Sequence, residues 1–151
     1  MANQNADLQT NSTATPPVRN KVNRQHGRIR HFEATITLAV ALAIGDTLTW
    51  GALPRGARVL GHLSKLYFSA GTASSTMNLG DAASAARHLA ATAINAAGSA
   101  VPEAQSASGA QFETSDDTTA ATNNCTLIST IAGAAAPIGQ VFTLKVAYVC
   151  D

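Results

Sequence analysis

The clearest pattern in the sequence is an alternation of large apolar residues with small or polar ones near the end of its first quarter. Between residues 32 and 44 the apolar side chains occupy every second position, and Glu33, Thr35, Thr37 and alanines lie between them. A period of two predicts a β-strand with one apolar face. A helix would spread the large residues around its circumference, and several are β-branched, which also favours a strand. We therefore predict a strand over residues 32–44.

Further extended segments follow, separated by the turn signals Gly45-Asp46 and Leu53-Pro54-Arg55-Gly56. Residues 57–69 carry apolar groups on both faces, so we expect them to be buried on both sides. The last segment is apolar enough to lie centrally in its sheet rather than at an edge. Including these two, the predicted later strands cover residues 47–50, 57–69, 75–79, 125–132 and 140–150.

The period changes between Asp81 and Ala97, where alanines and a few larger apolar residues recur near helical spacing. Asp81 is suited to cap the start of a helix and Gly98 to end one. We predict a short Ala-rich helix over residues 81–97. Together these elements predict a mainly β protein, an antiparallel β-sandwich or jelly roll with one short helix.

The first 31 residues differ from the rest, because they are rich in Asn, Gln, Thr, Ser and Pro and hold few large apolar groups. Such a segment cannot bury enough surface to fold alone. We predict two parts: an extended basic polar arm over residues 1–31 and a β-sandwich body over residues 32–151. About thirty extended residues reach at most about 100 Å, so the arm can span neighbouring subunits of an assembly.

Charge divides the chain in the same way. The 151 residues include 31 alanines, and only 13% are charged, for a net charge of +1. The arm has a net charge of +4 and the body one of −3. A surface poor in charge favours packing against other proteins. The basic residues of the arm are the candidate binding residues: Arg19, Lys21, Arg24, Arg28 and Arg30.

Two other roles are open to this basic cluster, a solvated tail and a nucleic-acid contact. Cations can neutralise phosphates, but no aromatic residue stands among them to stack on bases. We therefore favour a tether to a protein surface and expect no nucleic-acid partner.

Catalytic chemistry has no candidate constellation. The sequence lacks a phosphate-binding Gly-rich loop and a nucleophile elbow, and its four histidines show no metal-ligand spacing. The adjacent Asp116 and Asp117 are typical of a solvated loop rather than a cation site. We expect no enzyme activity, no cofactor and no metal.

The cysteines and the apolar run bear on the compartment. Cys125 and Cys150 are too few for a disulfide framework and fit a reducing cytoplasm, although their spacing leaves open whether they pair. Residues 34–44 are about half as long as a membrane-spanning helix. Ala41-Leu42-Ala43 resembles a signal cleavage site, but it follows a long polar segment. We expect neither a membrane anchor nor a signal peptide.

From Gly45 onward, the order of motifs resembles small structural proteins of tailed bacteriophages, particularly the cement or decoration proteins of the head. The passages that carry the resemblance are Gly51-Ala52-Leu53-Pro54-Arg55-Gly56-Ala57-Arg58-Val59-Leu60, Ser75-Thr76-Met77-Asn78-Leu79-Gly80-Asp81, residues 126–136 and residues 142–149. The long polar N-terminal segment departs from the more compact members.

This resemblance implies a body on the outer capsid surface, in virions assembled in the host cytoplasm, that reinforces contacts between major capsid protein subunits. The implied partners are the major capsid protein and a second or third copy of the chain, because dimers and trimers both occur. In the body, Arg55, Arg58 and Trp50 are the candidate contact residues.

Three other functions remain open. A neck or tail connector would share the virion setting but have a far lower copy number. A nucleic-acid-binding module would use the basic arm. A secreted or surface-attached protein would be marked by a mature N-terminus after Ala43.

Overall fold

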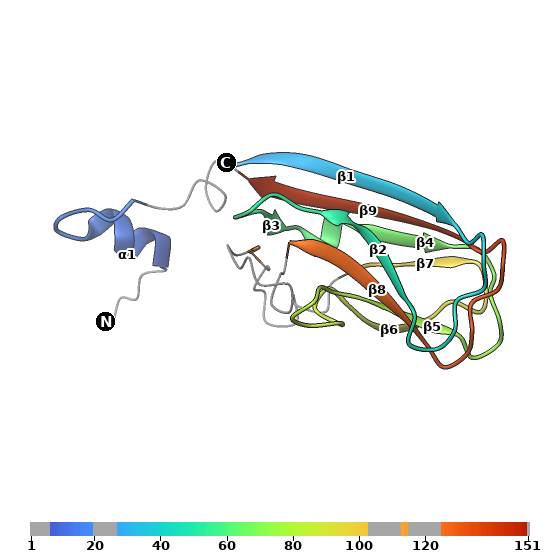
Figure 1. Ribbon diagram of the computed structural model, residues 1–151. Coiled ribbons are helices and arrows are strands. Elements are labelled where there is room, and N and C mark those ends of the chain that lie inside the picture. The colour runs from blue at the N-terminus through green and yellow to red at the C-terminus, as the bar shows by residue number, and fades with distance from the viewer. Residues whose placement is uncertain (1–6, 20–26, 103–112, 115–124, 151) are drawn as a thin grey trace.

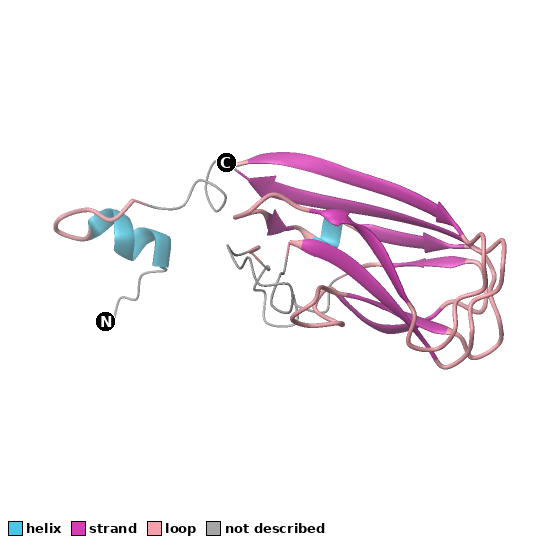
Figure 2. Ribbon diagram, in the orientation of Figure 1, coloured by secondary structure: helices cyan, strands magenta, loops and turns pink. Residues whose placement is uncertain are grey.

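Two antiparallel β-sheets face each other across an apolar core in the described part of the chain (Figures 1 and 2). The computed structural model describes residues 7–19, 27–102, 113–114 and 125–150. Its elements in chain order are α1 (Asp7–Thr13), β1 (Arg28–Thr37), β2 (Thr47–Ala52), β3 (Arg58–Val59), the 3-10 helix η1 (Gly61–Leu63), β4 (Lys65–Phe68), β5 (Thr76–Leu79), β6 (Leu89–Ala93), β7 (Gly98–Ala100), β8 (Thr126–Ala132) and β9 (Val141–Cys150). The predicted mainly β, antiparallel sandwich is confirmed.

The last strand is at the centre of one sheet, which has the order β1-β9-β4-β7 with β3 also paired to β9 and is called here the β1 sheet. β1 and β9 match without a bulge from Arg28 opposite Cys150 to Thr37 opposite Val141. On its other side β9 pairs with β4 and β3. The predicted central position of the last strand is confirmed, and its alternating pattern places Phe142 in the core with no exposed surface.

The other sheet has the order β2-β8-β5-β6 and is called here the β2 sheet. Burial alternates along β8, where Leu127, Ser129 and Ile131 are buried and the residues between them are half-buried. This is the pattern of a strand with one face on the core. The extended segments predicted over residues 47–50, 75–79 and 125–132 are therefore confirmed as β2, β5 and β8, to within two residues at either end.

Both sheets contribute to the core. Its largest fully buried apolar side chains are Phe142, Leu66, Met77, Leu79, Ile94, Leu127, Ile131, Leu144 and Val146. A second, smaller cluster of Leu60, Ala147 and Val149 lies apart from this core. Since Ala147 and Val149 alternate with Val146 and Tyr148, the small cluster covers the opposite face of β9.

The first strand is displaced toward the N-terminus from its predicted position. It begins at Arg28, inside the segment assigned to the arm, and ends at Thr37. The alternation continues to residue 44, but Val40 and Ile44 are 64% and 63% exposed. The pairing of β1 with β9 stops because the segment that leads into β9 turns at Gly139, whose φ is +79°. The predicted continuation of the strand to residue 44 is wrong.

The strand predicted over residues 57–69 is broken into β3, η1 and β4. Ser64 stabilises the break, because its hydroxyl donates to Leu60 O at 2.8 Å and accepts from Ala147 N at 3.0 Å. The predicted burial of residues 57–69 on both faces is confirmed only in part. Leu60 and Leu66 are buried, whereas Tyr67 is 41% exposed.

The helix predicted over residues 81–97 is wrong. Asp81 does cap backbone groups, accepting from Ala83 N and Ser84 N at 2.9 Å, but the chain makes turns there and then enters β6. Extended backbone lets β6 pair with β5 and carries Leu89 and Ile94 into the core. An alanine face would bury little area, so tertiary pairing overrides the local helix preference of alanine. The α-helix found among the described residues is α1, in the segment predicted to be an extended arm.

Gly80 is a point of close backbone approach next to this turn. Its N–H and C=O pair with Ile128 at 2.8 and 2.9 Å, and a Cβ placed on it would lie 2.0 Å from Ser84 O. Gly80→Ala is therefore expected to lower the free energy of unfolding by about 3 kcal/mol, because backbone must move. Urea denaturation measures this loss. In the control Gly98→Ala, the new Cβ has the Phe68 ring as its nearest neighbour, at 3.2 Å. Equal losses in the two variants would contradict the prediction.

Candidate protein-binding surfaces

Four arginines gather at the end of the sandwich where β1 begins. Arg28 on β1 and Arg58 on β3 lie on either side of the last two residues of β9, and Arg30 is the second residue after Arg28. Arg55 lies three residues before Arg58, in the turn after β2. Arg28, Arg30 and Arg55 are exposed, whereas Arg58 is half-buried and forms a β-bridge with Glu113. These four arginines are called here the basic end.

The basic end combines two predicted arm residues with two predicted body residues, which are far apart in sequence. Of the remaining arm candidates, Arg19 follows α1 and is exposed. Lys21 and Arg24 lie outside the described residues. Figure 1 shows α1 beyond the same end of the sandwich. The chain that precedes β1 therefore leaves the body at the end where these arginines are concentrated.

Trp50 lies in the core, whereas the sequence predicts it as a contact residue. Its side chain is 8% exposed and its Nε1 donates to Ser129 Oγ at 2.9 Å. The alternation along β2 turns Trp50 and Leu48 into the core and Thr47 and Thr49 outward. A large ring that is buried and hydrogen-bonded stabilises the body, so we do not retain Trp50 as a contact residue.

The outer face of the β2 sheet is the largest feature that sequence reasoning missed. None of the residues in β2, β5, β6 and β8 carries a charge. The outward positions of β2, β5 and β8 hold Thr47, Thr49, Thr76, Asn78, Thr126, Ile128, Thr130 and Ala132. Covering such a face with protein requires no charge to be desolvated. The alternation in residues 125–132 was the available signal for an outward face of β8. Only the sheet order places the outward faces of β2, β8 and β5 next to one another.

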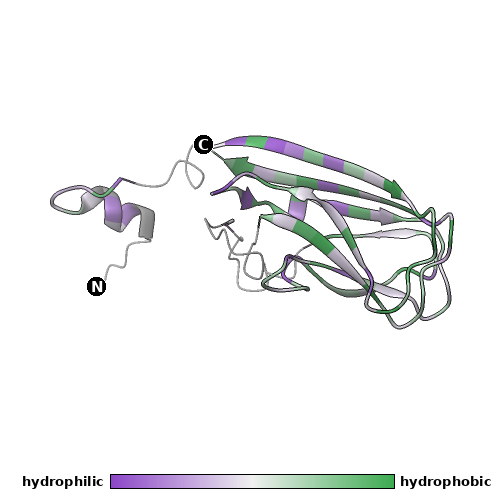
Figure 3. Cartoon of the chain, viewed as in Figure 1, coloured by the Kyte–Doolittle hydropathy of each residue, from purple (hydrophilic) through white to green (hydrophobic). Residues whose placement is uncertain are grey.

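The outer face of the β1 sheet is polar instead, and Figure 3 shows hydrophilic and hydrophobic residues alternating along β1. Polar side chains of the neighbouring strands β1 and β9 pair with each other on this face. Glu33 pairs with Lys145 at 3.2 Å, and the Thr35 and Thr143 hydroxyls lie 2.9 Å apart. Lys65 Nζ lies 5.4 Å from the centre of the Tyr67 ring. The Glu33–Lys145 and Thr35–Thr143 pairs link β1 with β9, whereas the Lys65–Tyr67 contact lies within β4, and exposed pairs of these kinds contribute modestly to stability.

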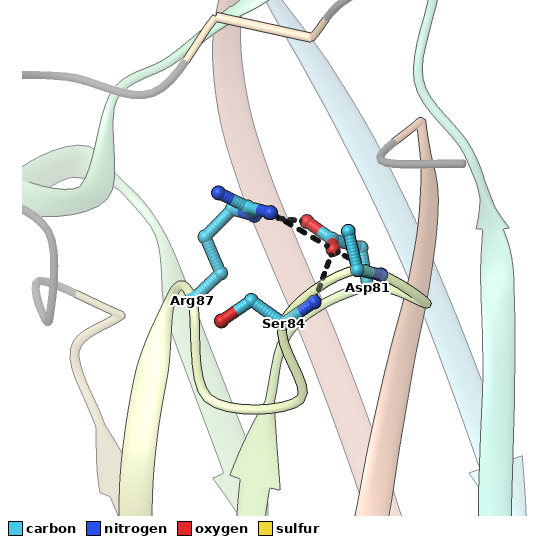
Figure 4. A network of polar contacts seen from close by, with 4 residues as sticks. Asp81, Ser84 and Arg87 are labelled. Atoms are coloured by element: carbon cyan, nitrogen blue, oxygen red, sulfur yellow. Dashed lines mark hydrogen bonds and ion pairs between the residues drawn. The ribbon is translucent and has the colours of Figure 1, made fainter. Parts of the chain in front are cut away.

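A buried charged cluster lies in the turn between β5 and β6 (Figure 4). The Asp81 side chain has no exposed surface, accepts backbone hydrogen bonds and pairs with Arg87. Burial lowers the pKa of His88 to about 4, against the opposing effect of Asp81 and with a contribution from Arg87. No group of three or more His, Cys, Asp or Glu residues that could hold a metal occurs within the described ranges. The hydrogen bonds and the ion pair of Asp81 organise the turn.

Cys125 is half-buried and Cys150 is buried, and no disulfide joins them. No helix in the described part of the chain is long and apolar enough to cross a membrane.

Comparisons with known proteins find similarity at the level of structure. No family model matches the sequence, and no curated protein matches it. The chain is similar to a chain of the cyanophage Pam1 capsid asymmetric unit, with a TM-score of 0.64 and 21% identity over 83% of this chain and 86% of that chain. A second match, to a chain in the acidic stable capsid structure of Helicobacter pylori bacteriophage KHP30, has a TM-score of 0.35 and 17% identity over 82% and 94% of the two chains. The sandwich is thus a fold that also occurs in a phage capsid.

Proposed function

We propose that this chain is a structural virion protein that binds the outer surface of a phage capsid and stabilises contacts between major capsid protein subunits. The observation that carries the proposal is the shared fold with a chain of the Pam1 capsid asymmetric unit. The similarity extends over most of both chains. The same assignment follows from the resemblance of residues 51–60 and 75–81 to cement proteins.

The basic end supports a tethering role for the N-terminal segment. Arg28, Arg30, Arg55 and Arg58 lie where this segment joins the body, so acidic groups of a capsid subunit that meet this end would contact exposed arginines such as Arg28 and Arg30. Contacts made by this segment would add to those of the body. Contacts linked in one chain act at high effective concentration, so several weak ones give tight attachment.

The uncharged face of the β2 sheet supports a second contact. Threonine hydroxyls and short apolar groups lose little side-chain entropy when they are covered. A face without charge also avoids the desolvation cost of covering charged groups. We assign the body contact to this face and the tether to the basic end.

Deletion of the N-terminal segment tests the tether. Because β1 begins at Arg28, the matched deletion covers residues 1–26, whereas removing residues 1–31 would also remove four residues of β1. Added to capsids that lack the chain, the truncated protein is expected to need at least about tenfold higher concentration to reach half-occupancy. Quantitative mass spectrometry of purified particles measures the occupancy.

A full-length variant with Arg19, Lys21 and Arg24 changed to glutamine separates charge from length. Lys145→Gln is a control that removes a charge from the polar face of β9. An unchanged affinity after deletion would remove the tether from the proposal. A full-length chain that does not bind the capsid exterior, or that occurs in roughly a dozen copies per particle or fewer, would point to a connector instead. DNA binding that falls steeply with salt would point to a nucleic-acid module.

A further inference from the structure

β1 is a long strand with one free edge. It pairs with β9 over all ten of its residues, and it is the first strand in the order of its sheet. Among the described residues no strand pairs with its other edge, and Figure 1 shows β1 on the outside of the sheet. It contains no proline and no bulge. Natural proteins usually protect such an edge, because it is a template for pairing with another strand.

The hydrogen-bond pattern identifies the backbone groups at this edge. Leu38 N donates to Gln140 O at 3.0 Å, just beyond the end of β1. In an antiparallel pair, bonded residues alternate with residues whose N–H and C=O point the other way. The even-numbered residues of β1 therefore bond to β9. The outward backbone groups belong to Ile29, His31, Glu33, Thr35 and Thr37.

The charges on β1 are distributed asymmetrically. Arg28, Arg30 and His31 lie in its first half, Glu33 lies near the middle, and the remainder of the strand is uncharged. A parallel copy would place the basic halves side by side. An antiparallel copy places the basic half of each strand against the uncharged half of the other.

We propose that β1 pairs antiparallel with β1 of a second copy, about a two-fold axis at Phe32. In this register His31 of each copy lies opposite Glu33 of the other, and Arg28 lies opposite Ile36. Sliding the second copy by two residues in one direction would place Glu33 opposite Glu33 of the other copy. Sliding it by two residues in the other direction would place His31 opposite His31. The proposed register also pairs the half-buried Phe32 rings with each other, an arrangement that stabilises antiparallel strands.

The pairing uses the outward backbone groups of Ile29, His31, Glu33 and Thr35 in each copy and forms about eight hydrogen bonds. It also covers part of Ile29, which is 56% exposed. The two N-terminal segments then leave the shared strands about 30 Å apart, at opposite ends, because Arg28 and Ile36 are opposed. A second copy is favoured over a foreign strand because the edge is complementary to itself. The pairing does not depend on capsid binding.

Cysteine cross-linking tests the register in the isolated full-length chain. His31→Cys/Glu33→Cys is made in a Cys125→Ser/Cys150→Ala background, so that the introduced thiols are the only ones. Mild oxidation is expected to give a covalent dimer on a non-reducing gel. The matched control His31→Cys/Thr37→Cys keeps both thiols on the same face but places no two opposite each other, and it is expected to stay monomeric on the gel.

A proline substitution tests the edge independently. Thr35→Pro removes an N–H that points away from β9, so the pairing inside the sheet is kept, and circular dichroism with thermal unfolding verifies the fold. Thr35→Val is the control, since it removes the hydroxyl that contacts Thr143 but keeps the N–H. Sedimentation is expected to show a dimer for the wild type and Thr35→Val, and at least tenfold weaker association for Thr35→Pro.

The proposal is overturned if the wild-type chain sediments as a monomer at its highest soluble concentration. It is also overturned if the wild type forms an oligomer that neither cross-links at positions 31 and 33 nor responds to Thr35→Pro, since another surface would then join the copies. Failure of capsid binding with an intact dimer would leave this pairing standing and count against the proposed function alone.

Discussion

Replacing Asp81 with alanine is expected to lower the free energy of unfolding by about 3–5 kcal/mol, since it breaks a buried charge network. Asp81 is 2% exposed, and its Oδ1 accepts hydrogen bonds from Ala83 N and Ser84 N at 2.9 Å. Its carboxylate also pairs with Arg87, whose side chain is 18% exposed. The alanine variant leaves the two amides without this acceptor and the guanidinium without its carboxylate. The turn formed by Asp81, Ser84 and Arg87, shown in Figure 4, would then lose these stabilising contacts.

Urea denaturation of Asp81→Ala at neutral pH measures the loss, provided that the slope with denaturant is unchanged. Asp81→Asn retains an oxygen for the amides and removes the charge, so its loss should be smaller. Asp46→Ala is the control, because Asp46 is exposed and its Oδ2 accepts from Ala43 N at 2.8 Å in a surface turn. We expect that control to cost about 1 kcal/mol or less. A similar cost for both alanine variants would show that the buried network adds no stability.

Acidification is expected to destabilise the body through His88. Burial lowers the pKa of this imidazole from 6.5 to about 4 in the folded chain. Above pH 6.5 the side chain is neutral in both states and stability does not depend on it. Between pH 6.5 and 4 the unfolded chain takes up the proton and the folded chain does not, so stability falls as the pH is lowered. The full difference corresponds to about 3 kcal/mol, of which about 2 kcal/mol is lost by pH 5.

The free energy of unfolding of the wild type and His88→Gln, measured between pH 6.5 and 5, tests this expectation. The glutamine variant removes the titrating group, so its stability should decline by about 1.5 kcal/mol less over this interval. His62→Gln is the matched control, since His62 is exposed on η1. It should follow the wild type. If His88→Gln shows the same decline as the wild type, another group is responsible for the acid response.

The fold class could be predicted because the strands that dominate it alternate strictly. β9 carries apolar residues at every second position, and β8 has a buried face of Leu127, Ser129 and Ile131. Each strand lies between two neighbours, so the local pattern and the tertiary environment agree. Over residues 81–97 the local pattern and the tertiary environment disagree, and the predicted helix is wrong there. Alanine favours a helix locally, but pairing with β5 and the burial of Leu89 and Ile94 decide the outcome.

The candidate surfaces could be predicted only in part. Charge arithmetic identified the basic residues, because charge is a property of the sequence itself. It could not bring Arg28 and Arg30 to the same end as Arg55 and Arg58, since β9, which lies between β1 and β3 and pairs with both, joins these strands into one sheet. The sequence predicts Trp50 as a contact residue, but its burial depends on which face of β2 meets the core.

The sequence alone determined the mainly β class, the central last strand, the low charge of the body and the basic character of the N-terminal segment, since these follow from composition and local period. Tertiary structure decided where β1 begins and ends, how residues 57–69 break, and which faces and edges stay open. The physical reason is that a strand ends where its partner turns away, and a side chain is buried only when another layer covers it. Both conditions depend on residues far away in the chain.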